Sequence, residues 1–256
     1  MHNELVTIGP VTIYGYGLMI AIGIYFAYRL LMYRAERKQF DEKHITSLTL
    51  WGLLGGFLGA KLLYWMTQIP NILSDPGILL NLGEGYVVYG GIIGGILAGF
   101  VYSKIYQLPF LRYMDLFVPS IALAQGFGRI GCLLAGCCYG AETNSWFGIT
   151  FLHSDIAPNG VSLVPTQILE SVFSFGVCFL LLFLAKRTNK AGIVAYAYLI
   201  LYSAGRFIIE FYRGDIIRGE VGILSTSQFI ALFIILAASA ILIAQKYQSQ
   251  WMSKNA

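Results

Sequence analysis

Seven apolar stretches divide this chain of 256 residues, and each approaches the ~20 residues that a helix needs to cross a bilayer. They cover Val11–Tyr33, Thr46–Met66, Tyr86–Tyr106, Tyr113–Ile130, Thr166–Ala185, Gly192–Tyr212 and Ser225–Gln245. Only 12% of the residues are charged, against about 25% in a soluble domain. The pattern predicts an all-α integral membrane protein with about seven transmembrane helices, which forms a single domain over residues 1–256.

Lysine and arginine gather in alternate connections between these stretches. They follow the first, third, fifth and seventh stretches, as Arg34, Arg37, Lys38, Lys43, Lys104, Arg112, Lys186, Arg187, Lys190, Lys246 and Lys254. The connections 67–85 and 132–165 contain none, and the remaining one holds Arg213 and Arg218. Because cytoplasmic loops carry the excess of basic residues, we expect an external N-terminus, a cytoplasmic C-terminus and a larger external loop at about 132–165. The net charge of +4 therefore follows membrane sidedness and does not indicate a nucleic-acid partner.

Glycines recur at helical spacing in the second and third stretches. They form overlapping GxxxG patterns, with Gly52, Gly55, Gly56 and Gly59 in one stretch and Gly90, Gly91, Gly94, Gly95 and Gly99 in the other. Small residues at this spacing let two helices approach closely in lipid. The pattern predicts that these two helices pack against each other.

A few ionisable residues remain inside the apolar stretches, where a charge at a helix centre costs about 3 kcal/mol. Arg129 and Arg206 each precede the external end of a stretch by a few residues. Guanidinium groups bind oxyanions bidentately, so two of them at one depth suit a phosphate. We interpret this pair as an anion site at the outer boundary of the bilayer.

The other intramembrane charges leave alternatives open. Arg206 and Glu210 are four residues apart, so they share a helix face and can form an ion pair that holds the helix in register. Glu170 either caps its helix or pairs with an arginine. Lys61 either extends outward to the interface or adds a third cation to the anion site. Asp115 fits a residue at the start of its helix.

Three cysteines, Cys132, Cys137 and Cys138, lie together on the predicted external side. With His153 as a fourth ligand they would make a zinc site, but the spacing matches no standard zinc motif. A disulfide that involves one of them is an alternative outside the cytoplasm. The preferred interpretation is packing of small residues in a re-entrant turn. Tyr16 and Tyr89, near outer helix ends, fit an interfacial aromatic belt when taken singly.

Ordered sequence segments cover most of the chain from Ile8 to Gln228. They are IGPV with YGYGLM (8–11 and 14–19), YGGIIGG (89–95), GFGRIG (126–131), PTQ with Glu170 (165–170), YSAGRFIIEFYR (202–213) and Ser227-Gln228. These segments resemble the signatures of the bacterial prolipoprotein diacylglyceryl transferase family, in the same order. We identify the chain from them as similar to that family.

The resemblance implies an activity. The family moves a diacylglyceryl group from phosphatidylglycerol to the lipobox cysteine of a preprolipoprotein, forms a thioether, releases glycerol phosphate, and uses no cofactor and no metal. It implies that Arg129 holds the lipid phosphate and that Arg206 and its companion Glu210 are catalytic. It places Tyr16 and Gly140 at the lipid site. It also implies a multi-pass protein of the bacterial inner membrane, whose partners are membrane lipid and lipobox signal peptides and not nucleic acid.

The chain departs from the family's pattern at named positions. Asparagine, asparagine and glutamate of the central signature are replaced by Cys132, Ala135 and Cys137, and two histidines by Tyr89 and Val164. Lys61 stands where the family has an arginine, and we assign it to the lipid site. Tyr89 is a poor base at neutral pH, so we expect it to donate a hydrogen bond to phosphate in the catalytic site. The base that activates the acceptor thiol stays unassigned.

Other functions fit the composition less well. A transporter or channel for an anionic solute would use the two arginines as a filter, but the chain shows no internal repeat. An intramembrane protease would need a serine with a histidine, or two facing aspartates, whereas Asp115 is the only intramembrane aspartate predicted. A non-catalytic scaffold does not explain paired arginines in a membrane.

Overall fold

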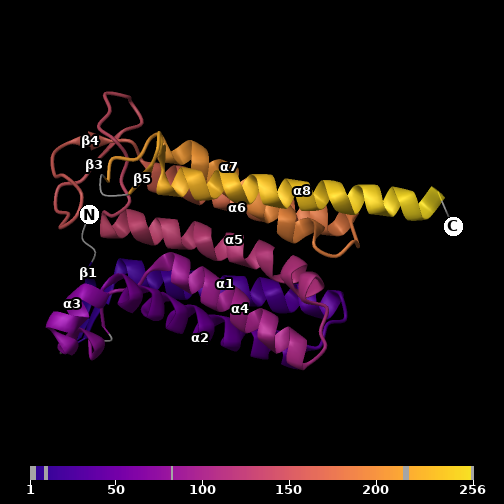
Figure 1. Ribbon diagram of the computed structural model, residues 1–256. Coiled ribbons are helices and arrows are strands. Elements are labelled where there is room, and N and C mark those ends of the chain that lie inside the picture. The colour runs from indigo at the N-terminus through magenta and orange to yellow at the C-terminus, as the bar shows by residue number, and fades with distance from the viewer. Residues whose placement is uncertain (1–3, 9–10, 82, 216–218, 255–256) are drawn as a thin grey trace. The chain divides into compact units, whose positions relative to one another are not determined.

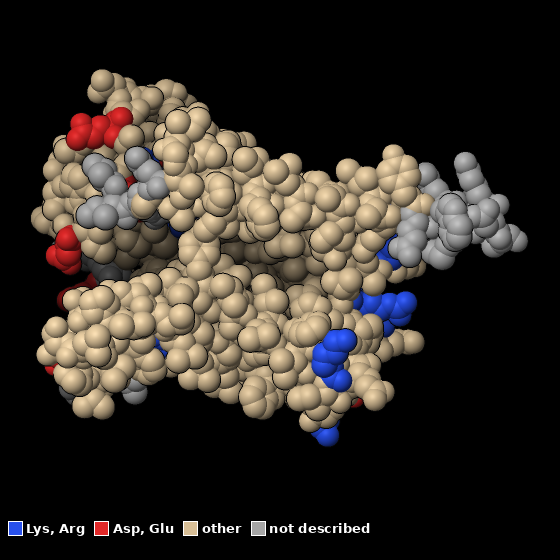
Figure 2. Space-filling model, in the orientation of Figure 1, with Lys and Arg blue, Asp and Glu red and all other residues tan. Residues whose placement is uncertain are grey.

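A computed structural model describes residues 4–8, 11–81, 83–215 and 219–254 (Figure 1). Gly9, Pro10 and Arg218, which the sequence analysis used, lie outside these ranges. Seven of the described helices are long and apolar enough to cross a membrane. They are α1 (Gly15–Arg37), α2 (Glu42–Thr67), α4 (Val88–Ile105), α5 (Phe110–Ala135), α6 (Thr166–Arg187), α7 (Ile193–Glu210) and α8 (Thr226–Lys254). The predicted all-α membrane architecture is confirmed. In Figure 2 the helix flanks are nearly free of charged side chains, which lie near the helix ends.

The first apolar stretch begins differently from the prediction. Val11–Tyr14 forms strand β2, which pairs with β1 (Glu4–Ile8) in an antiparallel hairpin, so the helix starts only at Gly15. The segment Val-Thr-Ile-Tyr is β-branched and aromatic, and such residues favour strands. Two further short hairpins pair β3 (Ile149–Thr150) with β4 (Ser162–Leu163) and β5 (Glu220–Val221) with β6 (Leu224–Ser225).

The fourth stretch is longer than predicted. α5 continues through Gly131 and Cys132 to Ala135, with Pro119 buried inside it, so the loop that was expected to begin at residue 132 begins at Gly136. The predicted external segment 67–85 also contains a short helix α3 (Ile69–Ser74) and a 3₁₀ turn η1 (Pro76–Leu79).

The described chain divides into two compact units, residues 1–31 with 114–256 and residues 32–113. In the first unit α6, α7 and α8 lie side by side (Figure 1). Its core joins α5, α6 and α7 through Ala122, Val177, Leu181 and Val194. Asp115 lies within α5 and not at its start. Its carboxylate accepts hydrogen bonds from the backbone of Gly192 (2.6 Å) and Ala195 (2.8 Å), so it caps α7.

The second unit is built on the contact between α2 and α4, as the glycine pattern predicts. A methyl group on Gly55 would lie 2.5 Å from Cβ of Ala98 and 2.7 Å from the carbonyl of Gly94. Gly59 and Gly90 face each other's backbone in the same way. The close approach therefore depends on the absence of side chains at these positions.

We expect Gly94→Leu to destabilise the second unit by at least about 2 kcal/mol, because the added side chain forces two backbones apart. Unfolding in mixed micelles of denaturing detergent measures the change. Gly52→Leu is the matched control, since a Cβ there meets no atom within 4 Å. Equal stability of the two variants would contradict the glycine contact.

Candidate active site

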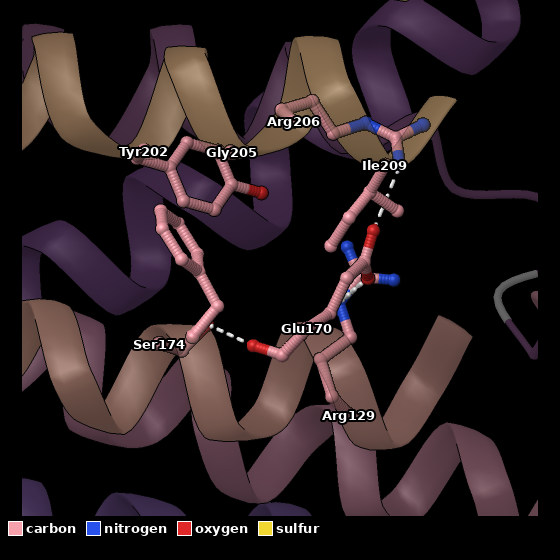
Figure 3. A pocket seen from close by; sticks show the side chains of 8 residues that line it. Arg129, Glu170, Ser174, Tyr202, Gly205, Arg206 and Ile209 are labelled. Carbon is pink, nitrogen blue, oxygen red and sulfur yellow. Dashed lines mark hydrogen bonds and ion pairs between the residues drawn. The ribbon is translucent and has the colours of Figure 1, made fainter. Parts of the chain in front are cut away.

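One buried carboxylate connects three helical elements of the first unit (Figure 3). Glu170, in the first turns of α6, lies 2.6 Å from Nε of Arg129 on α5 and 2.9 Å from Nη1 of Arg206 on α7. Nη1 of Arg213, just after α7, lies 3.8 Å from the same carboxylate. Glu170 is 8% exposed, so it meets three guanidinium groups away from bulk water. Of the two alternatives for Glu170, the ion pair with arginine is the one observed.

A second carboxylate fixes Arg206. Nη2 of Arg206 lies 2.6 Å from Glu210, which confirms the ion pair expected from their spacing. The hydroxyl of Ser225, at the end of β6, donates to Glu210 (2.9 Å), and Arg206 donates to Ser227 in the first turn of α8 (3.3 Å). Arg206 is therefore held from α6, from its own helix and from α8.

Arg213 has its own acidic partner. Its Nε donates to Asp215 (2.7 Å), its Nη2 bonds the same carboxylate, and its side chain is 4% exposed. The cluster thus combines three arginines with the carboxylates of Glu170, Glu210 and Asp215. Buried charges are tolerated when they are paired in this way. The formal charge of the cluster is balanced.

The space beside this cluster is small. A cavity of about 10 Å³ lies against Arg129, Glu170, Ser174, Tyr202 and Arg206 (Figure 3). That volume holds about one water molecule. The position between the guanidinium groups is occupied by the Glu170 carboxylate, so no open pocket lies there.

The helix that carries Arg129 ends in a turn that gathers the cysteines. Gly136 has φ of 69°, and its N–H donates to the carbonyl of Leu133 (3.2 Å), while the N–H of Cys137 donates to the carbonyl of Cys132 (3.1 Å). These two bonds form a Schellman motif, which favours glycine at the left-handed position. The motif brings Cys132 and Cys137 together although four residues separate them.

The sulfur atoms of Cys132, Cys137 and Cys138 all lie within 4.8 Å of one another. We call these three residues the thiol triad. His153 is not a member of this group, so the zinc set with His153 as fourth ligand is not formed. All four cysteines are free thiols, and the fourth, Cys178, lies elsewhere on α6.

The first turn of α6 anchors the triad. Gln167 donates from Nε2 to the carbonyl of Cys137 (2.8 Å), and Thr166 donates from its hydroxyl to the carbonyl of Cys138 (2.8 Å). Cys138 itself has φ of 61°, which a residue with a side chain adopts at a cost of about 1–3 kcal/mol. The loop packs its own small core behind this turn, with Phe151 against Leu133 and Tyr139.

Hydrogen bonds within the triad change the acidity of its members. Hydrogen bonds from Cys132 and Cys137, together with the nearby Arg213 guanidinium, lower the pKa of Cys138. The hydrogen bonds that Cys137 makes to Cys132 and Cys138 raise the pKa of Cys137. Arg213 thus joins Cys138 to the arginine cluster.

Sequence comparisons place this chain in a known family. The family model for prolipoprotein diacylglyceryl transferase matches residues 3–244. A phosphatidylglycerol–prolipoprotein diacylglyceryl transferase of Clostridium tetani is 48% identical over 93% of this chain and 95% of its own length. The second such protein of Clostridium perfringens is 46% identical over 88% of each chain, and that of Clostridioides difficile is 30% identical over the whole chain and 98% of its own. The chain belongs to the prolipoprotein diacylglyceryl transferase family.

Two of the predicted lipid-site residues lie beside the triad. Tyr16, in the first turn of α1, contacts Gly131, where an added methyl group would lie 3.1 Å from the tyrosine ring. Tyr16 also lies within electrostatic range of the triad and of Arg129. Gly140 pairs with Arg213 in an isolated backbone bridge, and a methyl group there would lie 2.8 Å from the carbonyl of Tyr212. Gly140 thus has a structural part in placing Arg213.

The remaining two predicted residues, Lys61 and Tyr89, belong to the second unit. Of the two alternatives for Lys61, extension outward to the interface is not the one observed, because its side chain is buried. Its Nζ donates to the carbonyls of Asn81 and Glu84, each at 2.6 Å, and it lies over the ring of Tyr86. These bonds hold the segment before α4. Tyr89 begins α4 with 40% of its surface exposed. Their assignment to the lipid and catalytic sites stays a prediction.

Arg213 is the member of the arginine cluster that sequence reasoning missed. It was counted with the loop charges because it follows the apolar stretch of α7. Two sequence signals point to it: Asp215 two residues on, and the smallness of Gly140 and Gly214, which lets the two segments meet. Neither signal specifies the contact without the fold.

We expect Glu170→Ala to lower the free energy of unfolding by about 3–5 kcal/mol, because it leaves buried guanidinium groups without their shared partner. Denaturing-detergent titration followed by tryptophan fluorescence measures the change. Glu142→Ala, at an exposed carboxylate in the loop between α5 and α6, is the control and should change little. A Glu170→Ala protein as stable as this control would show that the carboxylate does not hold the cluster.

Proposed function

We propose that the protein transfers the diacylglyceryl group of phosphatidylglycerol to the lipobox cysteine of preprolipoproteins. The products are a thioether and glycerol phosphate. The observation that carries the proposal is the arginine pair that meets on Glu170 between α5, α6 and α7. The printed names of the relatives from Clostridium tetani and Clostridium perfringens support the same donor and acceptor.

The reaction is an alkyl transfer. The acceptor thiolate attacks the glycerol carbon that bears the phosphate ester, a C–S bond forms, and the C–O bond to phosphate breaks. Negative charge grows on the departing phosphate, so fixed cationic donors lower the barrier. In a site that excludes water these interactions are stronger than in solution.

Arg129 is the group we assign to the phosphate. Glu170 engages its Nε, and a guanidinium offers five N–H donors, so the terminal nitrogens can bind phosphate oxygens. Arg206 already bonds Glu170, Glu210 and Ser227, so we assign it to holding Glu170 and to adding positive charge. The cavity is too small for a phosphate, so binding requires that Glu170 shift toward Arg206 and Arg213.

The chemistry takes place at the outer side of the membrane in this proposal. Glu170 lies in the first turns of α6, whereas Lys186 and Arg187 lie in its last turn. A helix of 22 residues spans about 33 Å, close to the thickness of the hydrocarbon core. The basic end marks the cytoplasmic side, so the carboxylate lies at the outer leaflet of a bacterial inner membrane, where lipobox cysteines of secreted precursors arrive.

The other predicted residues receive supporting roles. Tyr16 borders the triad and holds the lipid head group. Tyr89 and Lys61 contribute a hydrogen bond and a positive charge to the lipid, and Gly140 lets Arg213 reach Glu170. The anion-transporter alternative is not favoured, because the site has room for about one water and the relatives are named as transferases.

Arg129→Ala should lower the transfer rate by at least ~100-fold, as the loss of a donor to a developing oxyanion does. The assay combines purified protein in nanodiscs with phosphatidylglycerol and a lipobox peptide, and mass spectrometry detects the diacylglyceryl adduct. Arg129→Lys should stay far below the wild type, since an ammonium lacks the bidentate geometry.

Arg187→Ala is the matched control, because this arginine lies at the opposite end of α6 over the ring of Phe183. It should transfer at the wild-type rate. Wild-type transfer by Arg129→Ala would refute the role of that residue, and no adduct from the wild type beside an active control enzyme would refute the proposed function.

A further inference from the structure

The thiol triad is the part of the site that the family resemblance does not explain. Three sulfur atoms within 4.8 Å of one another form a compact set of soft ligands, partly buried and adjacent to the arginine cluster. We propose that Cys132, Cys137 and Cys138 bind one thiophilic divalent cation of the zinc class. Its fourth coordination position binds the acceptor thiol as a thiolate.

The dimensions of the triad suit such an ion. A Zn–S bond is about 2.3 Å, so two sulfur ligands of a tetrahedral ion lie about 3.8 Å apart. The three sulfur atoms need to approach by about 1 Å at most to reach this geometry. Three protein ligands with one open position are the arrangement of catalytic zinc, whereas structural zinc takes four.

The backbone holds the three ligands in place before any ion arrives. The Schellman motif at the end of α5 sets Cys132 beside Cys137 through the 3.1 Å bond between their backbones. Gln167 and Thr166 on α6 fix the next two carbonyls, and the strained φ of 61° at Cys138 turns its side chain toward the others. Conformational strain of this kind concentrates at functional sites.

The charges around the triad also fit. Three thiolates and a divalent cation carry a net charge of −1. Arg213 lies within electrostatic range of Cys138, and Arg129 within that of Cys132 and Cys138, so positive charge faces the complex. Arg213 also reaches Glu170 at 3.8 Å, which places the proposed ion next to the proposed phosphate site.

An unpaired buried atom points to a further ligand at this place. Gln167 is 1% exposed, and its Oε1 has no hydrogen-bond partner among the described residues. The other end of the same amide holds the carbonyl of Cys137. A buried acceptor without a donor is costly, and an N–H of an acceptor peptide bound at the triad would satisfy it.

The inference rests on the proposed function and supplies the missing activation of the acceptor. A thiol that coordinates such a cation loses its proton, here to solvent. The sulfur then forms the C–S bond with the glycerol carbon while the C–O bond breaks and the electron pair leaves with the phosphate. No residue of the chain then has to act as the general base. Tyr89, which stands where the family has a histidine, is not needed as a base.

Cobalt titration of the full-length protein tests the ion site directly. Protein in nanodiscs is treated with chelator and a phosphine reductant, and Co²⁺ is added while sulfur-to-cobalt absorption is followed. We expect one ion per chain. Serine at any triad position should weaken binding at least ~100-fold, since even outer-shell changes at metal sites cost about 10–100-fold. Cys178→Ser, outside the triad, should bind as the wild type does.

A lipobox peptide then tests the open position. Its addition should change the ligand-field bands of the bound cobalt, and a peptide with serine in place of cysteine should not. Three results would each overturn the inference. The first is the absence of a sulfur-to-cobalt band at one ion per chain, and the second is a band that remains in both Cys138→Ser and Cys138→Ala. The third is a cobalt spectrum that does not change when the peptide thiol is added. Thermal unfolding of each variant confirms that it folds.

The transfer assay separates this inference from the proposed function. If chelated protein and Cys138→Ser transfer the lipid at the wild-type rate, the ion has no part and the proposed function stands. If cobalt and the peptide thiol bind as expected but the wild-type protein restored with zinc makes no adduct, the ion site stands and the proposed function fails. If transfer falls at least ~100-fold on chelation and returns with zinc, both stand.

Discussion

The carboxylate of Glu170 is the interaction on which the rest of the site depends. It lies 2.6 Å from Arg129 and 2.9 Å from Arg206, and so joins α5, α6 and α7 at one depth in the membrane. Without it, two guanidinium groups would repel each other in a medium of low dielectric constant. With it, they stay paired, and the terminal nitrogens of Arg129 are the donors that we propose for the lipid phosphate. The carboxylate therefore keeps the two guanidinium groups together, as the proposed lipid site requires.

Arg213 extends this network to the turn that holds the thiol triad. It lies 3.8 Å from Glu170, bonds Asp215 and lies within electrostatic range of the thiol of Cys138. Gly140 makes the approach possible through its backbone bridge with Arg213. In the proposed mechanism, Arg213 therefore connects the groups that bind the leaving phosphate with the groups that bind the attacking sulfur. A displacement reaction needs these two functions side by side.

Sequence reasoning predicted the helices and the arginine pair because both depend on local rules. Apolar length determines the spans, and the spacing of Arg206 and Glu210 determines their ion pair. The contact of Glu170 with two arginines was one of two open alternatives, since only packing of α5, α6 and α7 selects it. Arg213 was missed because its burial results from a loop that folds back. The first strand was missed because Val11–Tyr14 is apolar enough to extend a helix.

The thiol triad could not be predicted from residue spacing. The spacing of Cys132, Cys137 and Cys138 matches no standard zinc motif, so the sequence alone favoured packing of small residues in a turn. The Schellman motif at Gly136 connects the last turn of a helix to the residues after it, and this geometry makes the spacing of five positions a contact. The charge of Lys61 does not reveal that its side chain is buried, because the burial depends on hydrogen bonds to nearby backbone carbonyls.

The most direct test of the central claim is a solid-state NMR distance between the guanidinium nitrogens of Arg129 and the phosphorus of bound phosphatidylglycerol. Protein labelled with ¹⁵N-arginine in phosphatidylglycerol bilayers should show ³¹P-dependent dephasing of a guanidinium signal that disappears in Arg129→Lys and persists in Arg187→Ala. Such a result would establish that the arginine held by Glu170 is the one that binds the lipid phosphate. Dephasing that is unchanged in Arg129→Lys, in a preparation that transfers lipid, would contradict the account.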